Sequence, residues 1–195
     1  MNSETSKTQD KSEVKFLIYN LTGADSFKCQ FVRDMCSELE IDFCCLQEHF
    51  KTTKTTETWF KKQFRDFHAN VLPAFRTPGI ECGRGKGGLL QLSDKRINAK
   101  KRRLICKSNR IQSQIITLKS LKILFMNCYF PTDPQSQASD NRELIETLAE
   151  VERIVSENED CEVLLCGDLN YERKRDNAFT QIIDQTLQRL NLQTA

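Results

Sequence analysis

The stretch Val163–Asn170, VLLCGDLN, sets an apolar run directly before a glycine, an acid and an amide. A short apolar run bounded by turn residues predicts a buried strand. Side chains alternate along an extended chain, so Asp168 and Asn170 are expected on one side, just past the end of that strand. Ligand and catalytic groups of α/β proteins gather at such strand ends. The structural alternative is that Asp168 only caps a turn or the next helix.

Other predicted apolar strands end in a similar way. They are VKFLIYN (14–20), which ends at Asn20, DFCCLQE (42–48), which ends at Glu48, and LKILFMNCYFP (121–131), which carries Asn127 and Tyr129. Acids and amides at several strand ends are typical of a hard-metal phosphate site, because Mg²⁺ takes one or two carboxylates and keeps several waters. Amides and a phenol can donate hydrogen bonds to charge that develops on phosphate oxygens.

The rest of the chain alternates helices and strands at both ends and has consecutive strands in the middle. Apolar stripes predict helices at 26–39 (Phe27, Phe31, Met35, Leu39), 56–67 (Trp59, Phe60, Phe64, Phe67 inward), 139–156 (Leu144, Leu148, Val151, Val155) and about 176–190. Extended segments are expected at NVLPAF, GGLLQLS, a basic stretch and RIQSQIITL (110–118), with Ser120 in a tight turn. This order predicts a mixed α/β (α+β) sandwich in which helices flank the sheets.

Length and composition indicate one globular domain. The chain has 195 residues, of which 29% are charged and 38% hydrophobic. No apolar run approaches the ~20 residues that a membrane helix needs, so a membrane partner is not expected. Residues 1–13 are polar and have no apolar core, which predicts a disordered tail rather than a secretory signal, and residues 14–195 are expected to form the domain.

The nine cysteines are odd in number, include no Cys-x2-Cys pair and mostly lie inside apolar runs. They are expected to be small buried hydrophobes in a reducing intracellular compartment, nucleus or cytoplasm. Only His49 and His68 are available as imidazole ligands, which argues against a zinc site and against a calcineurin-like metallophosphatase. The glycosylation sequon at Asn20-Leu21-Thr22 is an accidental match in a protein without a secretory signal.

Charge is distributed unevenly along the chain. Residues 84–110 hold ten Lys/Arg against one acid, whereas residues 133–176 hold thirteen acids against five bases. The basic segment predicts a contact with a polyanion, and the alternative is a solvated β-hairpin. The candidate nucleic-acid contacts are Arg84, Lys86, Lys100, Lys101, Arg102, Arg103 and Arg110.

Two apparent motifs do not fit their chemistry. Gly83–Gly88 matches G-x-G-x-x-G, but a strand-like segment follows it where a dinucleotide site needs a helix, so no nucleotide cofactor is expected. Lys86 precedes Gly87 rather than Ser or Thr, which excludes a P-loop. His49 follows Glu48 in an extended segment, so it is expected to point away from the Glu48 side into packing or surface.

The strand-end motifs resemble those of the endonuclease/exonuclease/phosphatase superfamily, the group of deoxyribonuclease I. In chain order they are Asn20, Leu46-Gln47-Glu48, Asn127-x-Tyr129-x-Pro131 and Gly167-Asp168-x-Asn170. A closer resemblance is to the endonuclease domain of LINE-type non-LTR retrotransposons, carried by CCLQEHF, GRGKGGLLQLS, NRI (109–111) and YFPTD. The resemblance covers about residues 14–195 and implies a four-layer sandwich of the DNase I type.

The resemblance also implies roles for the site residues. Glu48 would hold Mg²⁺, or Mn²⁺ in its place, with Asn20 close by. Asp168 would orient or deprotonate the attacking water, Asn170 would bind the scissile phosphate, and Tyr129 would contact phosphate or tune the electrostatics. Asn127 would support the loop structurally. The implied partner is the DNA backbone, with a reverse transcriptase domain in a longer parent protein.

One element of the superfamily pattern has no counterpart in this sequence. The pattern ends in Ser/Thr-x-x-Asp-His on a last core strand, but the chain ends 25 residues after Asn170 and has no histidine after His68. We therefore expect a sandwich without its last strands and an impaired endonuclease, since losing one preorganised group costs about 10²–10³ in rate. The alternatives are an inactive remnant that binds nucleic acid or protein, and a phosphatase of the same superfamily.

Overall fold

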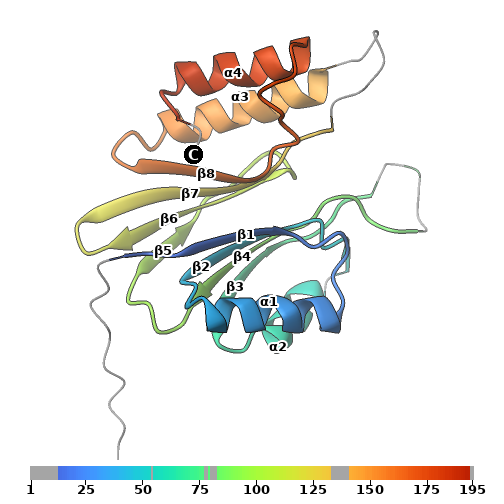
Figure 1. Cartoon of the computed structure of the whole chain (residues 1–195), viewed down its shortest axis with the longest axis vertical. Coiled ribbons are helices and arrows are strands. Elements are labelled where there is room, and N and C mark those ends of the chain that lie inside the picture. Colours follow the sequence, from blue (N-terminus) through green and yellow to red (C-terminus); the bar gives the residue numbers. More distant parts are fainter. Residues whose placement is uncertain (1–12, 54, 77–78, 80–82, 133–140, 194–195) are drawn as a thin grey trace, which may run out of the picture.

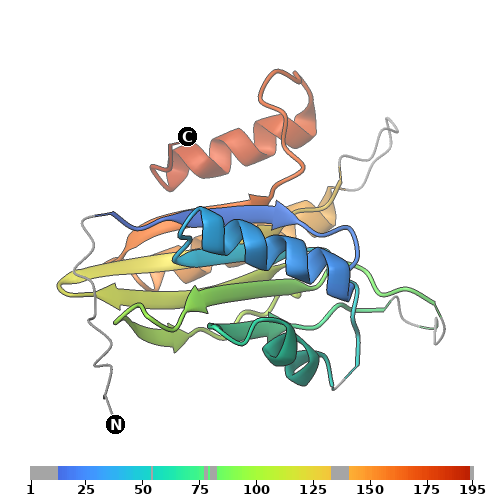
Figure 2. The same ribbon diagram turned by 60° about the horizontal axis from the view of Figure 1, so that its bottom comes forward.

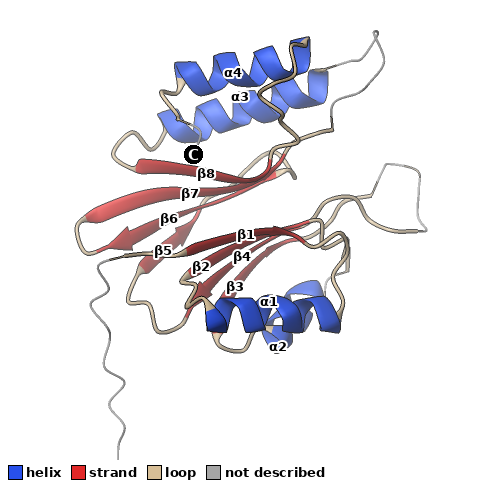
Figure 3. Cartoon of the chain, viewed as in Figure 1, coloured by secondary structure: helices blue, strands red, loops and turns tan. Residues whose placement is uncertain are grey.

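The computed structural model describes residues 13–53, 55–76, 79, 83–132 and 141–193. Two four-stranded β-sheets face each other, and helices cover the outer side of each sheet (Figure 1). The layers run helix, sheet, sheet, helix (Figure 3). This four-layer α/β sandwich of mixed sheets confirms the fold class that the sequence predicted. The expected N-terminal tail falls, apart from Glu13, outside the described residues.

The first sheet has the strand order β1 (Phe16–Asn20), β2 (Phe43–Gln47), β4 (Leu89–Asp94) and β3 (Phe67–Leu72). β1 is parallel to β2, and β4 is antiparallel to both of its neighbours. Helices α1 (Ser26–Glu38) and α2 (Thr56–Gln63) lie together on the outer face of this sheet (Figure 2). Their apolar residues, with those of β2 and β4, form the first part of the core.

The second sheet has the order β5 (Lys100–Arg103), β6 (Ile111–Leu118), β7 (Leu121–Tyr129) and β8 (Glu162–Asp168). β6 and β7 form an antiparallel hairpin whose turn contains Ser120, as expected, and β8 is parallel to β7. Helices α3 (Arg142–Ser156) and α4 (Ala178–Arg189) cover its outer face. Because β1–β2 and β7–β8 are parallel pairs, each sheet has two neighbouring strands that end at the same edge.

Between the sheets the core is partly polar. Phe43 and Phe125 meet across the interface with ring centroids 6.0 Å apart. Nearby, the side-chain amide of Gln91 donates to the carbonyls of Gln112 and Phe125 at 3.3 and 3.2 Å. The Gln112 amide donates back to the carbonyl of Asn70 at 2.8 Å. A buried amide that loses its hydrogen-bond partner carries an uncompensated desolvation cost. These contacts therefore fix the position of the two sheets relative to each other.

The prediction of which apolar residues of α1 face the core was wrong. Phe27 is 81% exposed, and Phe31 and Leu39 are about half exposed, while the buried face consists of Cys29, Val32 and Cys36. A four-residue step overshoots the helical turn by about 40°, so four such positions spread over about 120°. The three buried positions stay within about 60° of one another. Cysteine acts here as a small hydrophobe and completes the narrower stripe.

Helix α2 ends earlier than the sequence predicted. It stops at Gln63 rather than at residue 67, and Phe67 is the first residue of β3. Phe60, Phe64 and Phe67 are nevertheless all buried, so the inward-facing residues were identified correctly although the helix boundary was not. An aromatic run can be buried equally well by a helix and by the strand that follows it.

The cysteines fit the expectation of small buried residues. In the described part of the chain eight cysteines are free, and six of them are buried. No helix among the described residues has the length and apolar character needed to cross a membrane.

Candidate active site

Polar side chains from both sheets meet at one edge of the sandwich. Asn20 ends β1, Glu48 follows β2, Tyr129 ends β7 and Asp168 ends β8. The parallel pairing of Tyr129 with Asp168 and of Asn20 with Gln47 brings these strand ends to the same edge. The convergence of these four residues, predicted from separate stretches of sequence, is therefore present in the structure.

Asn20 and Asp168 connect the two sheets directly. The Asn20 amide nitrogen donates to Asp168 Oδ2 at 2.8 Å. The amide oxygen of Asn20 accepts from the Thr22 backbone N–H at 2.8 Å, which fixes the amide with its nitrogen toward Asp168. Asp168 Oδ1 also accepts from the Asn170 backbone N–H at 3.2 Å. In this geometry Asn20 holds a carboxylate in place, and its oxygen is already used by Thr22.

Gly167, which precedes Asp168, is required because strands β7 and β8 approach each other closely at this point. Gly167 has φ +127°, and a Cβ built on it would lie 2.0 Å from the carbonyl oxygen of Cys128 on β7. No other residue type fits there without moving backbone. The glycine at the end of the apolar run therefore lets β8 pack closely against β7, and this packing fixes the position of Asp168.

Glu48 and Tyr129 form the second connection between the sheets. The Tyr129 hydroxyl donates to Glu48 Oε1 at 2.5 Å. Burial, together with the hydrogen bond to Glu48 and its negative charge, raises the pKa of Tyr129 to about 12. The phenol consequently stays protonated at neutral pH and serves as a hydrogen-bond donor to the carboxylate.

The chain around Glu48 is held in an unusual backbone conformation. Glu48 and Phe50 both have positive φ, +56° and +58°, a region that costs non-glycine residues energy and is often found at functional sites. Between them His49 is buried, with Nε2 3.1 Å from the Leu72 carbonyl. A Cβ on Gly88 would lie 2.5 Å from the His49 ring. His49 thus anchors the loop while Glu48 and Phe50 face the cleft.

The environment of His49 removes it as a general base. Burial lowers the pKa of His49 to about 4, so the ring is a weak base, and both of its nitrogens already have hydrogen-bond partners. Its Nδ1 accepts from the Lys51 backbone N–H at 3.1 Å. The expectation that His49 packs away from the Glu48 side agrees with this position.

The two remaining motif amides tie loops together. Asn127 is fully buried, accepts from the Gln47 side chain at 2.7 Å and donates to the Leu46 carbonyl at 3.2 Å. It therefore supports the segment that ends in Glu48, as expected of a structural residue. Asn170, with φ +47°, donates to the Phe130 carbonyl at 2.8 Å. An amide has two N–H donors, so this contact leaves one for a ligand.

A cleft of about 610 Å³ opens beside Glu48 and Tyr129. Its lining combines cations with aromatic and small residues: Glu48, Phe50, Arg84, Gly85, Lys86, Gly87, Arg110, Tyr129, Pro131, Thr132, Asn141, Glu143, Leu144 and Phe179. A second recess of about 620 Å³ contains Asp168 and Asn170, and Thr132 lines both. The carboxylates thus face two adjoining hollows, of which the first carries three of the candidate nucleic-acid contacts.

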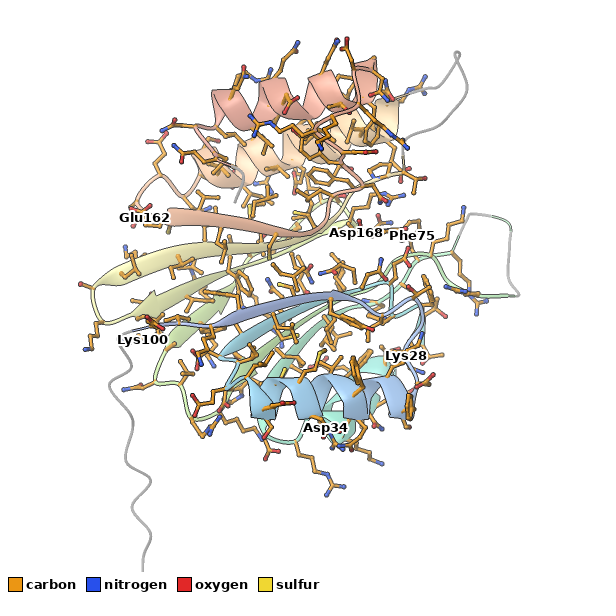
Figure 4. The ribbon with its side chains drawn as sticks, viewed as in Figure 1. Lys28, Asp34, Phe75, Lys100, Glu162 and Asp168 are labelled. Atoms are coloured by element: carbon orange, nitrogen blue, oxygen red, sulfur yellow. The ribbon has the colours of Figure 1, made fainter. Side chains whose placement is uncertain are left out.

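The basic segment is divided by the fold. Arg84, Lys86 and Arg110 line the cleft, whereas Lys100, Lys101, Arg102 and Arg103 form the edge strand β5. Lys100 and Asp168 lie at opposite ends of the sandwich (Figure 4).

Two of the β5 cations make contacts to the other sheet. Lys101 Nζ donates to Ser93 Oγ at 2.9 Å and Arg103 donates to the Ala69 carbonyl at 3.1 Å. The β5 residues are therefore separate from the candidate active site.

Arg110 was identified from sequence, but its surroundings were not. Its side chain is largely buried and pairs with Glu143 at 2.7 Å, and it donates to the Tyr129 carbonyl at 3.2 Å. The guanidinium lies 5.2 Å from the Tyr129 ring centroid. Arg110 therefore braces Tyr129. Glu143 and Thr22 had no recognisable sequence signal. Glu143 acts through a residue 33 positions away, and Thr22 acts through a local turn onto Asn20.

The donor set suits a hard, hydrated cation. Clusters of three or more His, Cys, Asp or Glu are absent from the described residues. Mg²⁺ is commonly held by only one or two carboxylates and keeps several waters. Glu48 and Asp168 supply two carboxylates at one edge, beside an open cleft. The residues present therefore fit such an ion.

Comparison with solved structures places this fold among known proteins. The chain is similar to the endonuclease domain of TRAS1, a telomere-specific non-LTR retrotransposon (TM-score 0.61, 14% identity, 91% of this chain and 71% of that one). It is also similar to the AP endonuclease LMAP of Leishmania major (TM-score 0.71, 15% identity, 91% and 67%). A third similar structure is an endonuclease/exonuclease/phosphatase family protein of Leptotrichia buccalis (TM-score 0.62, 15% identity, 89% and 73%).

Sequence comparison alone does not find these relationships. No protein-family model matches the chain, and no curated protein matches it. What the chain shares with these solved structures is its fold. The fold of this protein is the DNase I-like α/β sandwich of these solved structures.

Proposed function

We propose that the chain is a metal-dependent phosphodiesterase domain that acts on DNA, of the kind found in retrotransposon endonucleases. The observation that carries the proposal is the pair of hydrogen bonds across the sheets, Asn20–Asp168 and Tyr129–Glu48, beside a cationic cleft. Two similar structures are described as an AP endonuclease and a retrotransposon endonuclease domain, and a third, of D. rerio TDP2, holds a single-strand DNA product.

Each side chain has a distinct part in the proposed reaction. Asp168, oriented by Asn20, would accept the proton of a water that attacks the phosphorus atom. Glu48, fixed by the Tyr129 hydroxyl, would hold Mg²⁺. When bound, Mg²⁺ would supply charge that polarises the phosphate and stabilises the leaving oxygen. The free N–H of Asn170 would donate to a phosphate oxygen, while Arg84 and Lys86 would hold the strand.

A second candidate function is binding of nucleic acid without turnover. The described site contains no accessible imidazole, because His49 is buried and His68 lies on β3. A site that lacks one preorganised group commonly loses about 10²–10³ in rate. A reverse transcriptase partner and a reducing intracellular setting are further parts of the proposal, the latter supported by the free, buried cysteines.

Nicking of supercoiled plasmid by the 195-residue chain tests the proposal, with Mg²⁺, with Mn²⁺ and with EDTA. Metal-dependent nicking that disappears in Glu48→Gln and in Asp168→Asn supports the phosphodiesterase. If DNA binds with no nicking under any condition, the binding module is the better description. If nicking persists in both variants, the assignment of the site is wrong.

A further inference from the structure

A second recess lies between the two sheets, on the side where β3 and β5 form the sheet edges. This recess, the inter-sheet pocket, has a volume of about 260 Å³ and shares no residue with the strand-end cleft. Lys101 and Arg103 of β5 and His68 of β3 line it, and its lining among the described residues contains no Asp or Glu. The inter-sheet pocket therefore combines two cations with no acid in its wall to neutralise them.

The register of the strands explains why these cations face the pocket. Side chains alternate along a strand, so Lys101 and Arg103 share the face of β5 toward the first sheet, while Lys100 and Arg102 share the other face. Arg103 lies directly opposite Gln114 of β6, and cross-strand partners project from the same face. The basic run of β5 is thus divided into an inward pair and an outward pair, and the inward pair lies beside an amide.

Gln114 supplies an independent indication of a ligand. Its side chain is only 4% exposed and lines the inter-sheet pocket. Within the part of the chain that the structure describes, its amide has no hydrogen-bond partner. Buried amides are nearly always hydrogen-bonded, to protein, to water or to a ligand. The Gln114 amide can therefore be satisfied only from within the pocket.

The two cations of the pocket contact neutral groups. Lys101 Nζ and the Arg103 guanidinium donate to uncharged oxygens of the first sheet at 2.9 and 3.1 Å. Asp94, the acid whose charge acts on Lys101, already pairs with Arg96 at 2.6 Å. Burial lowers the pKa of Lys101, which means that its surroundings disfavour the charged form. An ammonium has three N–H donors and a guanidinium has five, so both cations keep donors for an anion.

We infer that the inter-sheet pocket binds a phosphate group, held by Lys101, Arg103 and the amide of Gln114. Guanidinium and ammonium groups hold phosphate oxygens through charge-assisted hydrogen bonds. The pocket volume is below the range of about 300–1,000 Å³ of sites for drug-sized ligands, so it suits one phosphate group rather than a whole nucleotide. The group is either inorganic phosphate or the phosphorylated end of a nucleic-acid strand. This inference goes beyond the proposed function and does not depend on it.

A phosphate group in this position would connect the two sheets. Lys101 and Arg103 belong to the second sheet, while Ser93 and His68 of the first sheet form the opposite wall. A ligand that binds only the docked sheets stabilises the folded state. Binding is therefore measurable as thermal stabilisation.

The test compares thermal unfolding in sodium phosphate and in sodium chloride of equal ionic strength, with EDTA present. We expect about 20 mM phosphate to raise the thermal midpoint of the wild type by about 4 °C over chloride, the shift that a Kd of about 1 mM gives in a chain of this length. The Lys101→Met/Arg103→Met variant should retain less than about a quarter of this shift, because it lacks both cations of the pocket.

Matched variants control for charge, for the strand-end cleft and for folding. Lys100→Met/Arg102→Met removes the same charge from the outward face of β5 and should keep the full shift. Arg84→Met/Lys86→Met removes exposed cations of the cleft and should also keep it.

A single substitution tests the amide separately. Gln114→Met replaces a buried amide with an apolar side chain of similar shape, so it is expected to fold even where the Lys101→Met/Arg103→Met variant does not. Its affinity for phosphate, measured by isothermal titration calorimetry, should be about tenfold lower than that of the wild type, because one hydrogen bond to a charged group is lost. An unchanged affinity would remove Gln114 from the site and contradict the inference.

Competition identifies the source of the phosphate group. A short oligonucleotide with a 5′-phosphate is compared with the same oligonucleotide with a 5′-hydroxyl, in the Arg84→Met/Lys86→Met variant. Stronger competition by the 5′-phosphorylated strand assigns the pocket to a strand end, and equal competition assigns it to inorganic phosphate.

Two further results would overturn the inference: equal thermal midpoints in phosphate and in chloride, or a full phosphate shift in Lys101→Met/Arg103→Met. Neither result changes the outcome of the plasmid nicking assay, so the inter-sheet pocket and the proposed hydrolysis stand or fail separately.

Discussion

The two ends of the sandwich contain similar charged residues but use them differently. At the site end, Asn20–Asp168 and Tyr129–Glu48 each pair a residue of one sheet with a residue of the other. At the opposite end, Lys122 of β7 pairs at the surface with Asp160, which lies in the turn before β8. The two carboxylates of the site are thus fixed by contacts between the sheets, whereas the Lys122–Asp160 pair is local and solvated. Composition alone cannot distinguish these two uses.

The basic segment shows the same contrast within one stretch of sequence. Arg84 and Lys86 line the cleft, whereas the β5 residues form a sheet edge. Edge strands in native proteins are often charged, which prevents pairing with other chains. We infer that the first residues of this basic run, Arg84 and Lys86, belong to the cleft, and that its middle part, β5, protects a sheet edge from pairing with other chains.

The largest expected effect concerns the two ends of β8. Asp168→Asn should lower metal-dependent nicking by about 10²–10³-fold, because it removes a group that acts on the attacking water. Asp160→Asn, before the other end of β8, should change the rate by less than about twofold, since exposed ion pairs contribute little. Plasmid nicking rates at saturating Mg²⁺ measure both. Equal losses in the two variants would break the contrast between the ends.

The second-largest expected effect concerns the packing of Gly88 against His49 at the site end of the sandwich. Gly88→Ala should lower the free energy of unfolding by about 3 kcal/mol, because a Cβ at φ +90° would overlap the His49 ring. Gly83→Ala is the control. It has φ +101° but nothing within 4 Å of the added Cβ, so only backbone strain of about 1 kcal/mol is expected. Urea unfolding measures the difference, and equal values would mean that His49 does not restrain Gly88.

A pH effect follows from the burial of His49. Its pKa falls from the ordinary 6.5 to about 4 on folding, so the neutral ring favours the folded state. This stability is fully present above pH 6.5 and is lost as the pH falls toward 4. We expect the free energy of unfolding, measured in EDTA, to drop by on the order of 2 kcal/mol across that range.

The control for this pH effect is a pair of variants. His49→Gln should show a shallower loss of stability between pH 6.5 and 4, whereas His68→Gln, at an exposed position on β3, should change the slope much less. Parallel slopes for the wild type and His49→Gln would contradict a buried neutral ring.

The smallest effect separates the two parts of the basic segment. Replacing Arg84 and Lys86 with Ser should reduce the slope of log affinity for duplex DNA against log salt by nearly 2, since each phosphate contact contributes about 0.9. Replacing Lys100 and Arg102 with Ser should change it less, because β5 lies away from the cleft. An equal reduction would show that β5 contacts DNA, as its composition alone predicts.

The sequence predicted the strands and their polar ends better than it predicted which side chains are buried or where β5 lies. Strand ends were identified because an apolar run and a polar terminus are both local, and parallel pairing then brings Asn20, Glu48, Tyr129 and Asp168 together. The burial of α1 was not predicted, because Phe27 looked more hydrophobic than Cys29, yet the spacing of Cys29, Val32 and Cys36 determines the buried face. The position of β5 depends on its pairing with β6, which a run of cations does not specify.

Some contacts of the site involve residues that a sequence motif marks, and others involve residues that no motif marks. Asn127 and Gly167 were visible in their motifs, although only the structure shows that Gly167 is needed for contact with Cys128. The Arg110–Glu143 pair spans 33 positions and two elements, so no local pattern marks it. The stacking of Arg84 on Phe50 is likewise a product of two loops that meet only in the folded chain.

The sheet-crossing pairs also have a kinetic consequence. Because Asn20 and Glu48 belong to one sheet and Asp168 and Tyr129 to the other, neither half of the molecule can assemble the site before the sheets dock. The site therefore forms only when the sheets dock and is lost when they separate. Any ligand that requires both carboxylates binds only the docked state, so it slows separation and makes the lifetime of the native protein depend on ligand concentration.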